Sequence, residues 1–264
     1  QLIKIILIKT FLNEDDIDSQ EQPEDRYFGN LVNVIKKKKY AYLSLCHIHK
    51  GFKSVVRKLN DRSIRCVIPY ESLLDCKDAL RAGRAALYSR LDLESLYFYG
   101  HDVTEIVEKE YLRSGLSVSN YVFYFVGKKI SEQFNLTKVV MTYENRGWEN
   151  AFIIGLKENP SRLHIMGYQH AVISPAATGY FVGVNESSLK PLPDIIYTTG
   201  KEPTAILREY GNYPAEKLVV GVGLRYKWLS EIRQRKCIEK RGAILLCLEG
   251  VPPVVEVIDY CSYC

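Results

Sequence analysis

The chain has 264 residues, of which 47% are hydrophobic and 25% charged, with a formal net charge of +5. This composition is typical of a folded protein with one large domain or two smaller ones. Its 36 basic and 31 acidic residues are mixed along the chain. The mild excess suits an anionic small ligand or a membrane surface and does not call for nucleic acid. No run of about 18 apolar residues occurs, so no transmembrane helix is expected.

The N-terminal third alternates short apolar runs with helical spacing. Residues 1–12 predict a strand rather than a signal peptide, because two lysines interrupt the run and no small-residue cleavage site follows. Residues 13–26 are acidic and polar, which predicts a solvated surface loop. Beyond them, the periodicity predicts helices at 28–35, 51–59 and 71–87 and strands at 40–46 and 64–70.

A run of four lysines, residues 36–39, follows the first of these helices. A solvated helix end is one interpretation, since cations are favourable at the C-terminus of a helix. Contact with anionic membrane lipid is the other, since lysine clusters attract such lipids.

A more regular pattern occupies the second half of the chain. Helices are predicted around 104–115 and over 116–136, and then near-continuous apolar strands alternate with helices. This alternation predicts an α/β fold, a Rossmann-like parallel sheet with helices on both faces. The expected strands are 137–144, 162–170, 192–200 and 217–223, with helices at 145–159 and 202–211.

The C-terminal part predicts a second domain. A further strand, 241–250, follows the basic stretch 232–241, and a lone strand–helix unit would bury too little surface to fold. We therefore expect one domain with its linker over 1–241 and the start of a truncated second domain over 242–264. Because residue 1 is not methionine, we also expect the chain to begin inside a longer reading frame.

Seven cysteines lie at positions 46, 66, 76, 237, 247, 261 and 264. An odd number, mostly in apolar runs, favours reduced and buried thiols in a cytosolic protein. Cys261 and Cys264 have CxxC spacing, but no second pair or nearby histidine cluster completes a zinc site. We expect no metal site.

Candidate site residues follow from the rule that ligands bind outside the carboxyl ends of parallel strands. His170 ends one strand and is either a general base, a phosphate contact or a loop-bonded histidine. Glu144 ends another strand, where it could be a base, order Gln169 and His170, or cap the next helix. Asn145 follows Glu144 and is a candidate for contacting the substrate.

The helix after Glu144 carries two further candidates. Glu149 lies a little over one turn along, where it either serves the site or faces solvent. Trp148 falls on the apolar side with Phe152, which favours packing.

Weaker signals lie at other strand ends. The stretch from Thr198 through Gly200 to Lys201 precedes a helix and is a candidate anion site. A glycine-rich turn, 221–225, lacks the third glycine of a dinucleotide fingerprint, but Arg225 could meet a phosphate. His47 and His49 either face the same cleft or lie in solvent, and 101–102 is either a His–Asp pair or a helix cap.

A series of motifs in this half resembles the bacterial surface carbohydrate biosynthesis glycosyltransferases of GT-B architecture, which serve capsule or lipopolysaccharide assembly. The resemblance runs from about residue 100 to the end and is strongest between 139 and 226. The motifs are YENRGWENA (143–151), MGYQHAVISP (166–175), PLPDIIYTTG (191–200), ILREYGNYP (206–214) and VGVGLRY (220–226).

The resemblance implies two Rossmann-like domains facing a cleft. The first would hold a glycan or lipid-linked acceptor, and the second a nucleotide-sugar donor. Such enzymes usually need no bound metal, so no cofactor is expected. The protein would act in the cytoplasm, and the inner face of the membrane is a further expected location. Because nearly all of the donor domain is absent, we expect this chain alone to be inactive.

On this resemblance, the predicted site has a catalytic part and a substrate-binding part. His170 and Glu144 are the expected catalytic residues. Two other functions stay open: a nucleotide-sugar epimerase of similar architecture, and a non-catalytic module that binds carbohydrate or a protein partner. The expected substrate-binding residues are Gln169, Asn145, Glu149, Gly200 and Arg225.

Overall fold

The computed structural model describes residues 3–18, 25–48, 50–88, 94–110, 118–159, 163–174 and 177–226. The strands are β1 Ile5–Leu12, β2 Ala41–Ile48, β3 Val67–Pro69, β4 Tyr97–Phe98, β5 His101–Asp102, β6 Leu136–Thr142, β7 His164–Tyr168, β8 Ile195–Thr198 and β9 Leu218–Val220. The helices are α1 Asp15–Asp18, α2 Leu31–Lys37, α3 Phe52–Asp61, α4 Cys76–Tyr88, α5 Thr104–Glu110, α6 Val118–Gln133, α7 Gly147–Lys157 and α8 Lys201–Glu209.

Seven strands form one parallel sheet in the order β3-β2-β1-β6-β7-β8-β9, and β4 and β5 form a separate antiparallel hairpin. The chain builds outward from β1 to β3, returns to place β6 beside β1, and then builds outward in the other direction. The predicted Rossmann-like α/β fold is therefore confirmed. Its topological switch point lies between β1 and β6, where such sheets bind ligands.

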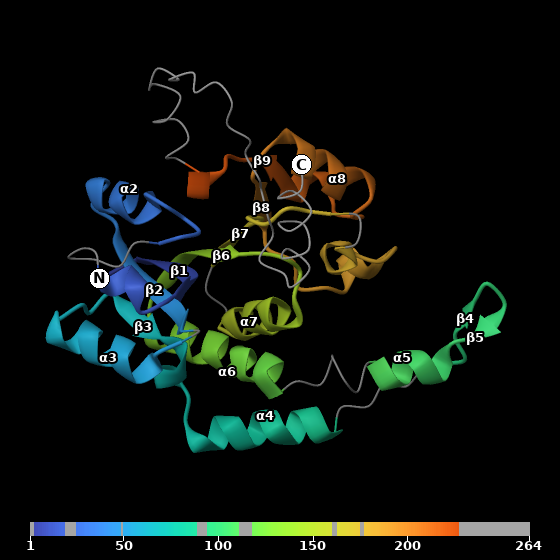
Figure 1. The fold of residues 1–264 in the computed structure, drawn as a ribbon, viewed down its shortest axis with the longest axis horizontal. Coiled ribbons are helices and arrows are strands. Elements are labelled where there is room, and N and C mark those ends of the chain that lie inside the picture. Colours follow the sequence, from blue (N-terminus) through green and yellow to red (C-terminus); the bar gives the residue numbers. More distant parts are fainter. Residues whose placement is uncertain are drawn as a thin grey trace, which may run out of the picture. The chain divides into compact units, whose positions relative to one another are not determined.

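Helices cover the two faces of the sheet through the alternation of side chains along each strand. On one face, odd-numbered residues such as Leu7 and Met141 form the main core with α6, α7 and α8. On the other, Ile8 packs with Ile35 of α2, and Cys46 packs with α3. Figure 1 shows α2 and the α6–α7 pair on opposite sides of the sheet.

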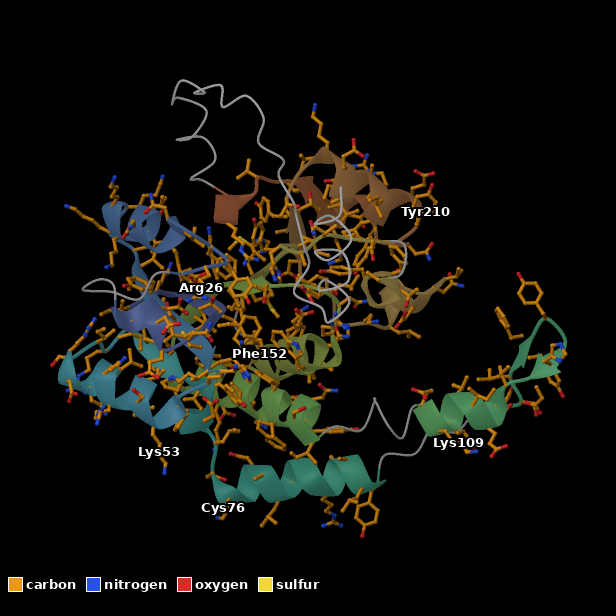
Figure 2. All side chains as sticks on the ribbon, viewed as in Figure 1. Arg26, Lys53, Cys76, Lys109, Phe152 and Tyr210 are labelled. Atoms are coloured by element: carbon orange, nitrogen blue, oxygen red, sulfur yellow. The ribbon has the colours of Figure 1, made fainter. Side chains whose placement is uncertain are left out.

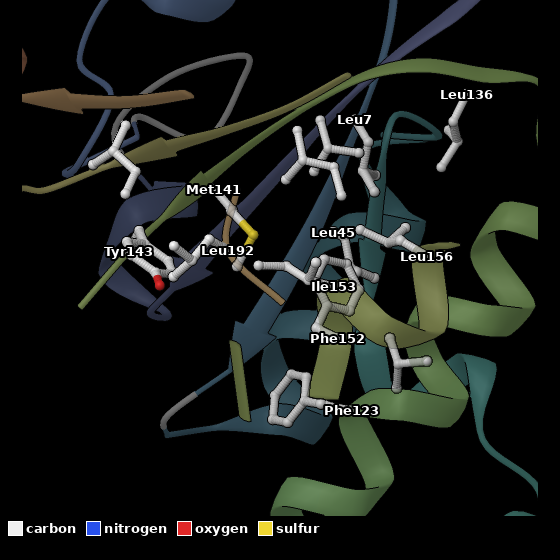
Figure 3. Close-up of a cluster of buried hydrophobic side chains, with 14 of the residues drawn as sticks. Leu7, Leu45, Phe123, Leu136, Met141, Tyr143, Phe152, Ile153, Leu156 and Leu192 are labelled. Carbon is white, nitrogen blue, oxygen red and sulfur yellow. The ribbon is translucent and has the colours of Figure 1, made fainter. Parts of the chain in front are cut away.

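The core between the sheet and the α6–α7 pair places α7 firmly. Phe152, Ile153 and Leu156 of α7 are fully buried and face Leu45 of the sheet (Figure 3). Their i, i+1, i+4 spacing gives the helix one apolar side. The start of α7, which follows β6 directly, is thereby fixed at the carboxyl edge of the sheet.

Two glycines let α6 and α7 approach each other closely. A Cβ atom on Gly155 would lie 2.0 Å from the carbonyl oxygen of Tyr124, and one on Gly127 would lie 2.4 Å from that of Phe152. Any side chain at either glycine would force the two backbones apart.

The acidic segment 13–26 is predicted to be a solvated loop. The structure describes residues 13–18 and 25–26 of it, and some of these depart from that prediction. Asp16, Ile17 and Asp25 are buried, so the prediction is wrong for these residues. Asp16 pairs with Arg26, and Asp25 accepts the backbone N–H groups of residues 27 and 28, both at 2.8 Å. Paired or hydrogen-bonded carboxylates can be buried at low cost, which composition alone does not reveal.

Other predictions concern the cysteines and the domain boundary. Among the described cysteines, Cys46 is buried, Cys66 is half-buried and Cys76 is exposed, and all three are free thiols. Residues 1–227 form one compact unit. The expected boundary at 241–242 and the CxxC pair lie outside the described residues. None of the described helices has the length and apolar character needed to cross a membrane.

Candidate functional site

The site is built where β6 and β7 end side by side. Thr142 pairs with Tyr168, the last residue of β7, and the two chains then carry Glu144 and His170 past the sheet edge. Nε2 of His170 lies 3.5 Å from Oε1 of Glu144. The structure therefore brings together the two residues predicted to be catalytic.

His170 lies in a mostly enclosed position. Its side chain is 11% exposed, and its ring packs edge-on against Tyr27 at 4.8 Å between centroids. Burial lowers the pKa of His170, Glu144 raises it in part, and Arg225 lowers it further. The neutral imidazole is therefore favoured, and Nε2 is the ring nitrogen that approaches Glu144. Within the described residues, the buried Nδ1 atom has no hydrogen-bond partner.

Two guanidinium groups lie beside this pair. Nε of Arg146 is 3.4 Å from Oε2 of Glu144, and the Arg146 side chain is exposed to solvent. Arg225, also exposed, lies over the Tyr27 ring at 5.9 Å from its centroid. Glu144 itself is 22% exposed, so a ligand can reach its carboxylate. Exposed guanidinium groups at a carboxylate suit an anionic ligand that also carries a hydroxyl group.

Arg146 is a residue that the sequence reasoning missed. It lies inside the first motif of the resemblance and directly before α7. A basic residue two positions after a strand-ending acid is the signal that could have found it.

A pocket of about 200 Å³ lies between His170 and the first turn of α8. Gly200 does not line it, and the expected contact of Gly200 with a ligand stays a prediction. Glu202 lines the pocket, and its negative charge disfavours an anion at the site predicted for 198–201. The lining residues are His170, Ala171, Val172, Ile173, Thr199, Glu202, Pro203 and Ile206.

Three residues predicted to touch the substrate are buried, and their contact with a ligand stays a prediction. Gln169 accepts the N–H of Thr199 at 3.1 Å and donates to the carbonyl of residue 171. Asn145 adopts a left-handed φ of 62° and donates to the carbonyl of Gly179 at 2.9 Å. Both side chains use their polar atoms to hold the site loops together, as does the third, Glu149.

Glu149 holds the backbone that carries Glu144. Its side chain is buried, with the residue 1% exposed, and its two oxygens accept the N–H of Glu144 at 3.0 and 2.9 Å. One of them also accepts the N–H of Arg146 at 2.8 Å, the backward reach of a capping box. Burial raises the pKa of Glu149 to about 8, while the two N–H groups and Lys9 oppose that rise.

Lys9 is the second residue that the sequence reasoning missed. It lies in the middle of β1 and is fully buried, with Nζ at 4.6 Å from the ring centroid of Phe11, 4.8 Å from Trp148 and 5.4 Å from Phe123. Burial lowers the pKa of Lys9 to about 8, and Glu149 is among the groups that oppose the change. The predicted packing role of Trp148 is confirmed, and its partners include this ammonium group.

The remaining candidates have structural roles or lie elsewhere. His47 stacks on Tyr70 at 4.9 Å and also contacts Phe11, whose ring contacts Tyr27, the aromatic partner of His170. His49 lies outside the described residues. Asp102 accepts the N–H of Thr104 at 2.9 Å, so the capping interpretation is confirmed.

The glycine-rich turn after β9 is shaped by packing. A Cβ on Gly221 would lie 2.4 Å from the carbonyl oxygen of Thr198, so this glycine lets the chain pass close to β8.

Within the part of the chain that the structure describes, no cluster of three or more histidine, cysteine or acidic side chains is arranged to hold a metal ion. Comparison of the chain with protein-family models, with curated proteins and with solved structures finds no match.

Proposed function

We propose that this chain carries the acceptor side of a glycosyltransferase site, which moves a sugar from a nucleotide-sugar donor to a glycan or lipid-linked acceptor of a cell-surface polysaccharide. The observation that supports this most strongly is the Glu144–His170 pair at the carboxyl edge of the sheet. It lies beside two exposed arginines. It follows β6 and β7, and β6 borders the switch point. The motif resemblance points to the same activity.

In the proposed step, Glu144 is the general base. It is the more exposed member of the pair, whereas the free ring nitrogen of His170 is enclosed. The acceptor oxygen bonds to the anomeric carbon, its proton passes to Glu144, and the bond to the leaving diphosphate breaks. His170, whose Nε2 lies 3.5 Å from Oε1 of Glu144, keeps the carboxylate oriented.

Arg146 and Arg225 supply positive charge for the leaving group. Nucleoside diphosphates are anionic, and guanidinium groups bind phosphate oxygens through paired hydrogen bonds. Both side chains are exposed on the side of the Glu144–His170 pair. Loss of either should therefore weaken the binding of a diphosphate more than that of a neutral glycan.

The test is a turnover assay on the protein expressed from its natural reading frame. Labelled nucleoside-diphosphate sugars are supplied with and without glycan acceptors, and sugar transfer is followed. We expect transfer, with kcat lowered by about 10²–10⁴-fold in Glu144→Gln. Glu158→Gln is the matched control, because Glu158 is exposed at the end of α7.

Two results would contradict the proposal. A wild-type kcat in Glu144→Gln would show that Glu144 is not the general base. Epimer formation from the donor without any transfer would instead favour a nucleotide-sugar epimerase.

A further inference from the structure

An apolar groove of about 290 Å³ lies beside α2, on the sheet face opposite α6 and α7. Its volume is at the lower end of the range for small-molecule sites, about 300–1,000 Å³. The lining is apolar and aromatic apart from two lysines, and it includes no acid. The lining residues are Ile6, Phe28, Leu31, Val34, Ile35, Lys38, Tyr40, Lys138, Val140, Met166, Gly167, Tyr168, Tyr197 and Leu224.

The floor of the groove is a partly exposed face of the central strands. Val140, Met166 and Tyr197 come from β6, β7 and β8, and their side chains alternate with core residues on the opposite face. Among the described elements, α2 forms the wall. Val34 on this helix is 43% exposed and Tyr40 after it is 58% exposed. A contiguous apolar surface of this kind marks a binding site more often than isolated exposed residues do.

The positive charge is concentrated at one end of the groove. Lys138 pairs with His164, the first residue of β7, so it lies at the amino-terminal edge of the sheet. Lys38 follows α2 and precedes β2. Both are exposed, and neither forms an ion pair with any residue that the structure describes. An occupant with an apolar chain and an anionic head matches this arrangement.

The other end of the groove lies toward the Glu144–His170 pair. Tyr168, at the carboxyl end of β7, donates its hydroxyl to the carbonyl of Val222 at 3.1 Å and accepts the N–H of Leu224 at 2.9 Å. A head group held by Lys38 and Lys138 would therefore lie at the opposite edge of the sheet from Glu144. The occupant of the groove is not the reacting substrate.

We propose that this groove binds one apolar chain of an anionic membrane phospholipid, with the lipid phosphate at Lys38 and Lys138. The groove residues take no part in the proposed transfer step, so the inference does not depend on the proposed function. It assigns Lys38, from the lysine run at the end of α2, to a specific lipid site rather than to general attraction. Lipid chains contribute affinity through burial of methylene groups, and lysines through attraction to anionic head groups.

The first experiment measures cosedimentation of the full chain with phosphatidylcholine vesicles, with and without phosphatidylglycerol. We expect binding that requires phosphatidylglycerol. Lys38→Gln/Lys138→Gln should weaken it by roughly 25-fold, because each lysine near an anionic surface is worth about fivefold. The matched control is Lys37→Gln/Lys53→Gln, which removes the same charge outside the groove; Lys53 projects from α3 in Figure 2. Equal losses in both pairs would overturn the proposal.

A second variant keeps the charge and fills the groove. Val34→Trp is chosen because Val34 is partly exposed, so the fold should tolerate the larger side chain. Calorimetry should show that the wild type binds monomeric decyl phosphate but not inorganic phosphate. Val34→Trp should not bind decyl phosphate. Retention of decyl phosphate binding by the variant would overturn the proposal. So would a lipid-free dimer of the wild type that Val34→Trp dissociates, since the groove would then hold a second copy.

Discussion

Glu144 owes its position to two fully buried residues. The carboxylate of Glu149 holds the backbone of Glu144 and Arg146, and Lys9 lies beneath it in a cage of three aromatic rings. A buried charge is costly unless hydrogen bonds and an opposite charge compensate it. The two residues compensate each other in part, since each opposes the pKa shift of the other.

Glu149→Ala should lower the free energy of unfolding by about 2–3 kcal/mol. The substitution leaves two partly buried backbone N–H groups without their acceptor and removes a helix cap. Urea denaturation of Glu158→Ala is the control, where we expect a change within about 0.5 kcal/mol because the side chain is exposed. A Glu149→Ala effect as small as this control would show that the cap is dispensable.

Lys9→Met should remove a pH dependence of stability. The pKa of Lys9 is about 8 in the folded protein and 10.5 as its ordinary value. Between these values the unfolded chain keeps the proton and the folded chain has lost it, so raising the pH favours folding. The free energy of unfolding of the wild type, relative to Lys9→Met, should rise between pH 8 and 10.5, by at most about 1.4 kcal/mol per pH unit. A difference that stays flat over this range contradicts the assignment.

At the scale of elements, the contact between α6 and α7 fixes the start of α7 and with it Glu149. The helices meet backbone to backbone at Gly127 and Gly155. Interiors are packed to crystal-like density, so an added methyl group here has no room.

Gly155→Ala should therefore destabilise the protein by about 1–3 kcal/mol, the usual cost of overpacking. Gly83→Ala in α4 is the matched control, because a Cβ there meets nothing within 4 Å. Alanine is favoured over glycine inside helices, so the control should gain about 0.5–1 kcal/mol. Thermal or urea unfolding compares the two variants, and equal effects would rule out the close contact.

The elements of the sheet were predictable from the sequence, whereas the roles of several site residues were not. Strand and helix periodicity is local, so β6, α7, β7, β8 and α8 follow from it. Burial of a polar side chain depends on partners brought in from elsewhere. Gln169 bonds to Thr199, the residue after β8, and Lys9 is buried by Phe123 and Trp148 from later in the chain. The sequence around the end of one strand does not reveal partners that come from other parts of the chain.

At the scale of the whole described unit, the two edges of the sheet have different chemistry. The carboxyl edge carries Glu144, His170 and the two arginines, while the amino edge carries Lys138 at the mouth of the apolar groove. The proposed transfer reaction uses the first, and the proposed lipid contact uses the second. The central claim is that Glu144 and His170 act as one unit in the transfer reaction.

A double-mutant cycle on kcat/KM tests this claim most directly, with Glu144→Gln, His170→Ala and the double variant assayed for sugar transfer. Residues that act as a unit show strongly non-additive losses. We predict that the double variant is no slower than Glu144→Gln alone. Losses that multiply, or wild-type activity in Glu144→Gln, would contradict the account.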